Sequence, residues 1–265
     1  MFILHQKEPR NLRAAVFDFD GTLSTLRCGW EAVMLSLMTD YLGPQAEAEC
    51  KQYIDESTGI QTIHQMKWLC EKVMSGQNPK HAPPDPWFFK EEYNRRLMVG
   101  IDEKRRAIAK KPALRQTYLI PGAENFLQLL QKNNIALFAA SGTDETDVQA
   151  EAKLLGLAPY FQEIHGAQPR SELCGKEAVL RNLLKNSRIP PEQILICGDG
   201  KVEIRLGARQ GCPTLGIASR EEELSGAMDS AKKARLTEAG ADAIAADFSE
   251  LPALADWLGI KESIQ

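Results

Sequence analysis

A short apolar run that ends in two closely spaced acids limits the fold more than any other feature of this chain. The run covers residues 14–17, and the sequence continues Asp18, Phe19, Asp20, Gly21, Thr22. An apolar run that stops at a turn signal predicts a buried strand. We therefore expect both acids at the carboxyl end of a strand, where open α/β folds keep reactive groups. Taken alone, the motif is also typical of a plain turn in which Thr22 caps the next helix.

The second half of the chain alternates between short strand and helix patterns. Apolar runs predict strands at residues 135–140, 162–166, 194–198, 214–218 and 243–246. Helical patterns lie between and around them, at 121–132, 146–155, 175–186, 203–210 and 251–258. This alternation predicts a doubly wound, Rossmann-like α/β core with a parallel sheet that helices cover on both faces.

A long segment without strong strand signals separates the first strand from this alternating part. Helical patterns occupy residues 30–41, 47–55, 60–74 and 87–110. We therefore divide the chain into a core, residues 1–25 and 116–265, and an inserted α-helical cap domain, residues 26–115. An insertion at the carboxyl end of the first strand is expected to overhang the two acids as a lid, which excludes water and contacts the substrate.

Composition excludes several classes of protein. The net charge of −4 argues against nucleic acid as the main partner. No apolar run is long enough to cross a bilayer, and the first ten residues lack the apolar segment of a signal peptide, so we expect a cytoplasmic protein without a membrane partner. The six cysteines lack Cys-x-x-Cys spacing, which argues against a disulfide framework or a zinc site.

Two later segments carry groups that can hold a phosphate. Ser141 and Gly142 follow the predicted strand 135–140, and a hydroxyl with free backbone N–H groups at a strand end can bind phosphate oxygens. On its own this segment is equally well explained as a helix N-cap. Lys176 lies at a predicted helix start, where a cation opposes the helix dipole, so an anionic neighbour would suit it.

A second pair of acids follows the strand at 194–198. Asp199 comes directly after that strand, and Glu203 follows four residues later. Both carboxylates can face one cation, directly or through water, as a hard oxygen site for Mg²⁺. Gly200 and Lys201 do not form a phosphate-binding P-loop, because the upstream Gly and the following Ser or Thr are missing.

In this order the four segments resemble the four motifs of the haloacid dehalogenase superfamily of phosphohydrolases. The insertion after the first motif resembles that of the phosphoglycolate phosphatase and β-phosphoglucomutase-like members. The resemblance implies that Asp18 is the nucleophile, and that Asp20 protonates the leaving oxygen and then activates water. An acid at position 20 favours a phosphate ester over a halide, since a halide leaves without a proton. The phosphate-binding residues that the resemblance implies are Thr22, Ser141, Gly142 and Lys176. The implied Mg²⁺ ligands are Asp18, Asp20 through its backbone carbonyl, Asp199 and Glu203.

Two stretches outside the motifs leave alternatives open. The break at Ser57, Thr58 and Gly59, with His64 just beyond, is either a substrate-specificity loop or the solvated end of a helix. The charged segment 219–237 is either a surface helix, which we favour, or a border of the active-site entrance.

These observations predict a Mg²⁺-dependent phosphatase that hydrolyses a small phosphorylated metabolite, such as a sugar phosphate or phosphoglycolate, through an aspartyl-phosphate. One alternative is a sugar phosphomutase that uses the same aspartyl-phosphate. A more distant alternative is a non-catalytic binding protein, which the retention of all the motif acids disfavours. The sequence does not indicate an oligomeric state.

Overall fold

A mostly parallel sheet forms the centre of the computed structural model, which describes residues 1–5, 11–76, 85–168, 170, 176–186 and 188–260. Within these residues the sheet has seven strands in the order β1-β7-β6-β5-β2-β3-β4. The strands are β1 (Phe2–Ile3), β2 (Ala14–Phe17), β3 (Ala136–Asp144), β4 (Glu163–Ala167), β5 (Ile194–Gly198), β6 (Thr214–Ile217) and β7 (Ala243–Ala245). Only the short edge strand β1 runs antiparallel to its neighbour, β7. The predicted α/β fold is confirmed.

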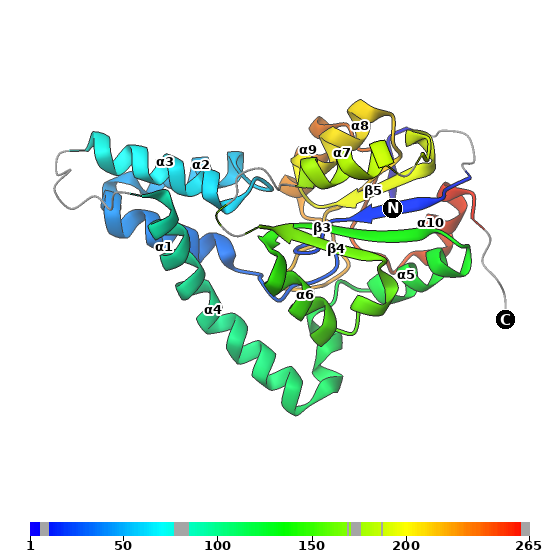
Figure 1. Ribbon diagram of the computed structural model, residues 1–265, viewed down its shortest axis with the longest axis horizontal. Coiled ribbons are helices and arrows are strands. Elements are labelled where there is room, and N and C mark those ends of the chain that lie inside the picture. Colours follow the sequence, from blue (N-terminus) through cyan, green and yellow to red (C-terminus); the bar gives the residue numbers. More distant parts are fainter. Residues whose placement is uncertain (6–10, 77–84, 169, 171–175, 187, 261–265) are drawn as a thin grey trace.

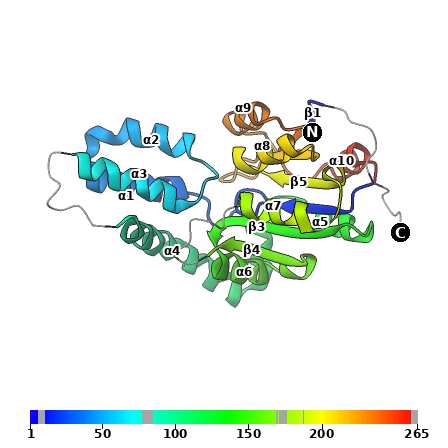
Figure 2. The same cartoon turned by 45° about the horizontal axis from the view of Figure 1, so that its top comes forward.

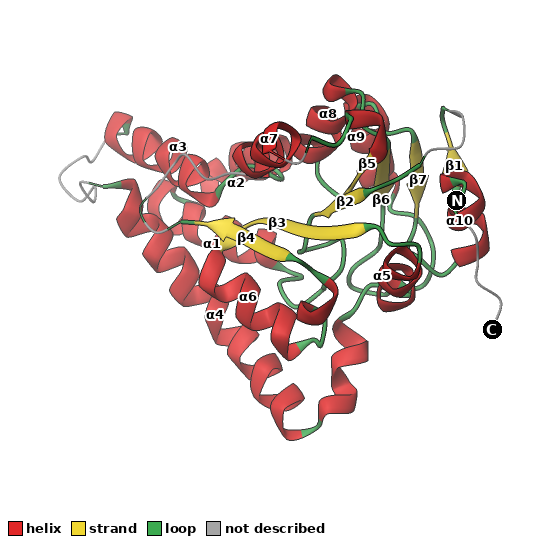
Figure 3. Ribbon diagram, turned by 45° about the vertical axis from the view of Figure 1, so that its right-hand side comes forward, coloured by secondary structure: helices red, strands yellow, loops and turns green. Residues whose placement is uncertain are grey.

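Helices pack on both faces of the sheet (Figure 1). One face carries α7 (Lys176–Asn186), α8 (Lys201–Gln210) and α9 (Ser230–Ala239). The other carries α5 (Ala123–Lys132), α6 (Glu145–Leu154) and α10 (Leu251–Leu258). Figure 3 shows the strands enclosed between the two layers.

Strand β2 contributes side chains to both of these layers. Ala15 and Phe17 belong to the large core cluster under α5, α6 and α10, whereas Ala14 and Val16 pack with residues of α7 and α8. A four-residue strand with every side chain buried is typical of the middle of a parallel sheet. Phe17 pairs in register with Ala139 of β3 and Cys197 of β5, so β2 and β5 end at nearly the same level and β3 continues past them.

The inserted segment between β2 and β3 is helical, with a hydrophobic core of its own. Its helices are α1 (Trp30–Leu42), α2 (Glu47–Glu56), α3 (Thr62–Ser75) and α4 (Pro86–Lys110). Buried apolar residues from all four form a cluster separate from those of the sheet, including Leu37, Ile54, Met66 and Phe89. Figure 2 shows these helices beside the sheet rather than on one of its faces. The domain limits at residues 26 and 115 stay a prediction.

The structure differs from the expected elements in a few places. Strand β3 continues to Asp144 instead of ending at residue 140, so Ser141 lies in a strand and is not the N-cap of α6. The interpretation of Ser141 as a helix cap is therefore wrong. The edge strand β1 was not expected, because two residues are too short for a visible pattern. Among the described residues, no helix is long and apolar enough to cross a membrane.

Candidate active site

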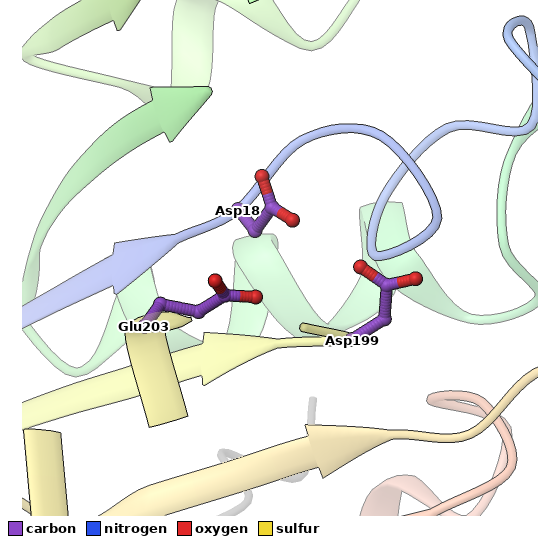
Figure 4. Close-up of side chains that lie close together, drawn as sticks. All are labelled: Asp18, Asp199 and Glu203. Atoms are coloured by element: carbon purple, nitrogen blue, oxygen red, sulfur yellow. The ribbon is translucent and has the colours of Figure 1, made fainter. Parts of the chain in front are cut away.

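Three carboxylates meet where β2 and β5 end (Figure 4). Asp18 follows β2, Asp199 follows β5, and Glu203 lies in the first turn of α8. When one carboxylate oxygen is taken from each residue, the three oxygens all lie within 4.8 Å of one another. Neighbouring parallel strands bring their carboxyl ends to the same edge, which is why residues so far apart in the sequence converge here. Clustered carboxylate oxygens are the donors that Mg²⁺ prefers, so this set fits that ion.

A buried lysine partly balances this acidic cluster. Lys176, at the start of α7, places its Nζ 2.5 Å from Oδ2 of Asp18 and 3.3 Å from Oε2 of Glu203. The other oxygen of Glu203 accepts a hydrogen bond of 2.7 Å from the backbone N–H of Gly200. Glu203 therefore holds both Lys176 and the loop that carries Asp199.

The surroundings shift the pKa values of this cluster in different directions. Burial raises the pKa of Asp18 well above its usual range; Lys176 opposes this rise, and Glu203 and Asp199 add to it. Burial also acts to raise the pKa of Asp199, but Lys232 and Lys176 outweigh it and lower that pKa. A nucleophilic carboxylate has to be ionised, so further positive charge beside Asp18 would favour its reactive form.

Asp20 is held apart from this cluster by hydroxyl groups. Its Oδ2 accepts hydrogen bonds from Ser141, at 3.1 Å, and from Thr143, at 2.8 Å. Its Oδ1 is buried without a hydrogen-bond partner among the described residues, and Nε of Arg27 lies 3.8 Å away. The two motif acids thus have different surroundings, as an acid and a nucleophile require. No sequence pattern around Thr143 or Arg27 indicates these contacts.

Arg27 belongs to a buried network of ion pairs on the cap side of Asp20. It donates two hydrogen bonds to Glu151, which is completely buried, at 2.8 and 3.2 Å. Arg105 of α4 also donates to Glu151, at 2.7 Å, and approaches Asp147 at 3.3 Å. A basic run such as the one around Arg105 is by itself typical of a solvated helix face. This side chain instead turns inward, because the buried carboxylate of Glu151 needs cationic partners.

The charged segment 219–237 reaches the site as well. Lys232 of α9 places its Nζ 2.9 Å from Oδ2 of Asp199 and 2.5 Å from Oε1 of Glu221. These side chains are largely buried, and burial raises the pKa of Glu221 to about 7 even though Lys232 opposes the rise. Only part of the segment is helical, and the favoured interpretation as a surface helix is wrong for these two residues. The local sequence held no signal for this contact, because charged residues are frequent throughout the segment.

The remaining phosphate-site predictions occupy different places. Thr22 is fully buried, with its hydroxyl 3.5 Å from Oδ1 of Asp199. Gly142 lines the cavity together with Ser141 and Lys176. Gly21, between the two motif acids, has a φ of +73°, and a side chain there would meet Asp199, since an added Cβ would lie 2.3 Å from its Oδ2. Only glycine fits this turn.

Only part of the predicted specificity loop of the cap lines the main cavity. Thr58 and Gly59 line the cavity above the strand ends, and Gly59 lies against Gly200, whose Cα is 3.6 Å from the place of an added Cβ. Ser57 instead donates its hydroxyl to the carbonyl of Tyr53 within the cap, at 2.6 Å. His64 lines a neighbouring hollow.

One cavity connects the motif residues with the cap. The residues that line it include Asp18, Asp20, Arg27, Trp30, Thr58, Gly59, Lys90, Tyr93, Asn94, Ser141, Gly142, Asp144, Asp147, Lys176, Asp199 and Glu221. A cavity with convergent polar groups between two subdomains is the usual form of a small-molecule site.

Comparison with known proteins gives a consistent family. A family model described as haloacid dehalogenase-like hydrolase matches residues 12–211. Phosphoglycolate phosphatases from Salmonella typhi and Escherichia coli (strain K12) are each 23% identical, over 78% of this chain and 82% and 81% of theirs.

Solved structures show the same fold. A predicted phosphoglycolate phosphatase from Haemophilus somnus matches with a TM-score of 0.63 and 18% identity, over 92% of this chain and 98% of that one. A β-phosphoglucomutase from Clostridium difficile matches with a TM-score of 0.63 and 15% identity, over 94% and 97%. With the family model spanning all four motif segments, the chain belongs to the haloacid dehalogenase-like hydrolases.

Proposed function

We propose that this protein is a Mg²⁺-dependent phosphatase of a small phosphorylated metabolite. The observation that carries the proposal is the contrast between the two motif acids. Asp18 lies among acidic oxygens against Lys176, whereas Asp20 lies beyond them with one oxygen held by hydroxyls. The names of the phosphoglycolate phosphatases that it resembles support the same reaction.

In the first step Asp18 attacks the phosphorus atom. A bond forms between a carboxylate oxygen and phosphorus, and the bond to the ester oxygen breaks. Asp20 gives its proton to that oxygen, so the alcohol leaves neutral. Lys176, 2.5 Å from Asp18, offsets the charge that the phosphoryl group brings toward the carboxylate.

In the second step water replaces the alcohol. Asp20, now ionised, takes a proton from the water molecule while the water oxygen bonds to phosphorus. The bond between phosphorus and the Asp18 oxygen breaks. Inorganic phosphate is released and both acids return to their starting states. Ser141 and Thr143 keep Asp20 in place throughout, because both donate to the same oxygen.

The Mg²⁺ ligands in this proposal are Asp18, the backbone carbonyl of Asp20, and Asp199, with Glu203 supporting them. Bound there, the ion would supply positive charge between two anions, the Asp18 carboxylate and the phosphate. Lys232 fixes Oδ2 of Asp199, which leaves Oδ1 to serve as a ligand.

The proposal is tested by phosphate release from a panel of phosphorylated metabolites and from p-nitrophenyl phosphate. We expect turnover with Mg²⁺, loss of turnover in EDTA, and recovery when Mg²⁺ is restored. Turnover that persists in EDTA contradicts the metal site. Transfer of the phosphoryl group to a second sugar phosphate, in place of release to water, would identify a mutase instead.

A further inference from the structure

The cap side of the cavity differs in charge from its catalytic end. It is lined by Trp30 from α1, by Lys90 and Asn94 from α4, and by Asp144 and Asp147 of the core. This is the part of the cavity available to the organic portion of a phosphate ester whose phosphorus lies at Asp18. In the proposed phosphatase these residues would therefore contact the alcohol part of the substrate.

The cations on this side are already neutralised. Lys90 places its Nζ 2.5 Å from Oδ1 of Asp144, and Asn94 donates to Oδ2 of the same carboxylate at 3.1 Å. Arg27 is committed to Glu151 through two hydrogen bonds. Among the described lining residues, the third cation is Lys176, which is paired with Asp18.

The acids on this side are at least as numerous as the cations. Arg27 and Lys90 line the cavity with Asp144 and Asp147, and Arg105 pairs with Glu151 behind them. Asp20 beside Arg27 and the exposed Asp102 beside Arg105 add further carboxylates. A substrate with a second negative group would displace an existing ion pair or bring its charge against Asp144 and Asp147. Both outcomes cost free energy, because a buried charge without a partner is strongly unfavourable.

An uncharged alcohol meets no such penalty. Its hydroxyls can donate to Asp144 or Asp147 and accept from the amide of Asn94, while the indole of Trp30 offers an apolar face. Carboxylates that are already paired with a cation remain able to accept hydrogen bonds, since each oxygen has two lone pairs.

We propose that the cap side selects by charge: the substrate is a phosphate monoester of an uncharged, hydroxyl-bearing alcohol, and esters with a second anionic group are rejected. This proposal rests on the phosphatase function above and narrows it. It separates sugar-like phosphates from phosphoglycolate-like ones, which the sequence left together. The organic part is recognised by hydrogen bonds to paired carboxylates and amides, not by a free cation.

The test uses two esters of equal size, the terminal phosphate esters of glycerol and of glyceric acid. They differ only at the end carbon opposite the phosphate, which is a hydroxymethyl group in the first ester and a carboxylate in the second. Each is measured as a competitor of p-nitrophenyl phosphate hydrolysis, so each gives an inhibition constant whether or not it is itself turned over. We expect the carboxylate ester to bind about tenfold more weakly or worse. The ratio of inhibition constants, that of the carboxylate ester divided by that of the glycerol ester, is then about ten or more.

Two substitutions reverse or strengthen this preference. Asp144→Asn keeps the shape and the Asn94 contact but leaves the Lys90 charge unpaired, so it should shift the ratio of inhibition constants about tenfold toward the carboxylate ester. Lys90→Gln leaves Asp144 unpaired and should shift the ratio the other way. The opposite signs distinguish charge selection from general damage to the pocket. Asp40→Asn, which removes a carboxylate from the cap surface where it pairs with Arg96, should leave the ratio unchanged.

A wild-type ratio at or below one, or failure of both esters to compete, overturns the charge selection while p-nitrophenyl phosphate hydrolysis leaves the phosphatase function intact. Shifts of the same sign in both variants overturn it as well. Absence of p-nitrophenyl phosphate hydrolysis would remove the proposed function and this inference together.

Discussion

The catalytic end and the cap side of one cavity handle charge in opposite ways. At the catalytic end, four carboxylates of Asp18, Asp199, Glu203 and Glu221 contact two ammonium groups, Lys176 and Lys232. On the cap side, three carboxylates face three cations. Counted with every group ionised, the first region has two more negative than positive charges, which equals the charge of one divalent cation. The second region has three of each when Asp20, between the two regions, and the exposed Asp102 are left out of the count.

The difference in charge indicates which ligands each region can bind. Buried carboxylates in excess make a site that gains free energy when a divalent cation binds, because the cation removes their mutual repulsion. A balanced set gains nothing from a further charge of either sign. In the proposed function the chemistry is thus concentrated where the charges are unmatched, and the proposed selection of the organic group acts where they are matched.

Asp20 lies between the two regions, and its removal should have the largest effect. Asp20→Asn keeps an acceptor for Ser141 and Thr143 but removes the proton that the leaving alcohol needs. We expect kcat for an alkyl phosphate such as the glycerol ester to fall about a thousandfold, since general acid–base catalysis contributes 10²- to 10⁴-fold. Steady-state phosphate release measures the fall.

The matched control for this variant is the leaving group. p-Nitrophenolate departs without a proton, so the variant should still show a rapid first release of p-nitrophenolate, stoichiometric with enzyme, in stopped flow. An equal loss of the first turnover for both esters would place the function of Asp20 elsewhere.

Substitution of Lys232 tests the excess of negative charge at the catalytic end. Lys232→Met removes the cation from two largely buried carboxylates, Asp199 and Glu221. We expect a loss of about 2 kcal/mol in the free energy of unfolding without metal, which is less than the roughly 3 to 5 kcal/mol for a fully buried pair because both acids keep some solvent contact. Mg²⁺ should restore part of this loss, since it would bind one of the stranded acids.

Thermal and urea unfolding with and without Mg²⁺ measure this effect. Lys51→Met is the matched control, because Lys51 forms an exposed pair with Glu47 on the cap, worth less than about 0.5 kcal/mol. Equal destabilisation by the two substitutions would argue against a strongly coupled cluster at Asp199.

Glu124 lies outside both regions and shows the size of an ordinary ion pair. Partial burial acts to raise the pKa of Glu124, but hydrogen bonds from Gln116 and Arg115 outweigh it and lower that pKa. A lowered carboxyl pKa stabilises the fold above the unfolded value of 4.5, and this stabilisation disappears as the pH falls through the folded pKa. Glu124→Gln should therefore cost about 0.5 to 1 kcal/mol near neutral pH and almost nothing in acid. Urea unfolding at both pH values checks this, and a cost that grows in acid would contradict it.

The convergence of Asp18, Ser141 and Asp199 was predictable from sequence. Each follows an apolar run or lies at its end, and parallel strands in one sheet bring such ends to one edge. The helical insertion was predictable for a similar reason, because its periodic apolar residues needed a core of their own.

The long-range pairs were not predictable. Arg27 and Glu151 are 124 residues apart, and Lys232 and Asp199 are 33 apart across a segment rich in charge. Nothing local distinguishes a lysine that turns toward a buried acid from one that stays in solvent. The prediction that Ser57 contacts the substrate failed to foresee a local contact. Its hydroxyl donates to the carbonyl of Tyr53, one turn earlier in the cap, and does not line the cavity.

The central claim, that Asp18 becomes phosphorylated, is tested most directly by trapping. The Asp20→Asn variant is mixed with p-nitrophenyl phosphate and Mg²⁺, quenched in acid during the first turnover, and digested for mass spectrometry. The account predicts one added phosphoryl group on the peptide that contains Asp18, and no such group when Asp18→Asn is combined with the same background. Burst release of p-nitrophenolate without a phosphorylated Asp18, or with the label on another residue, would contradict it.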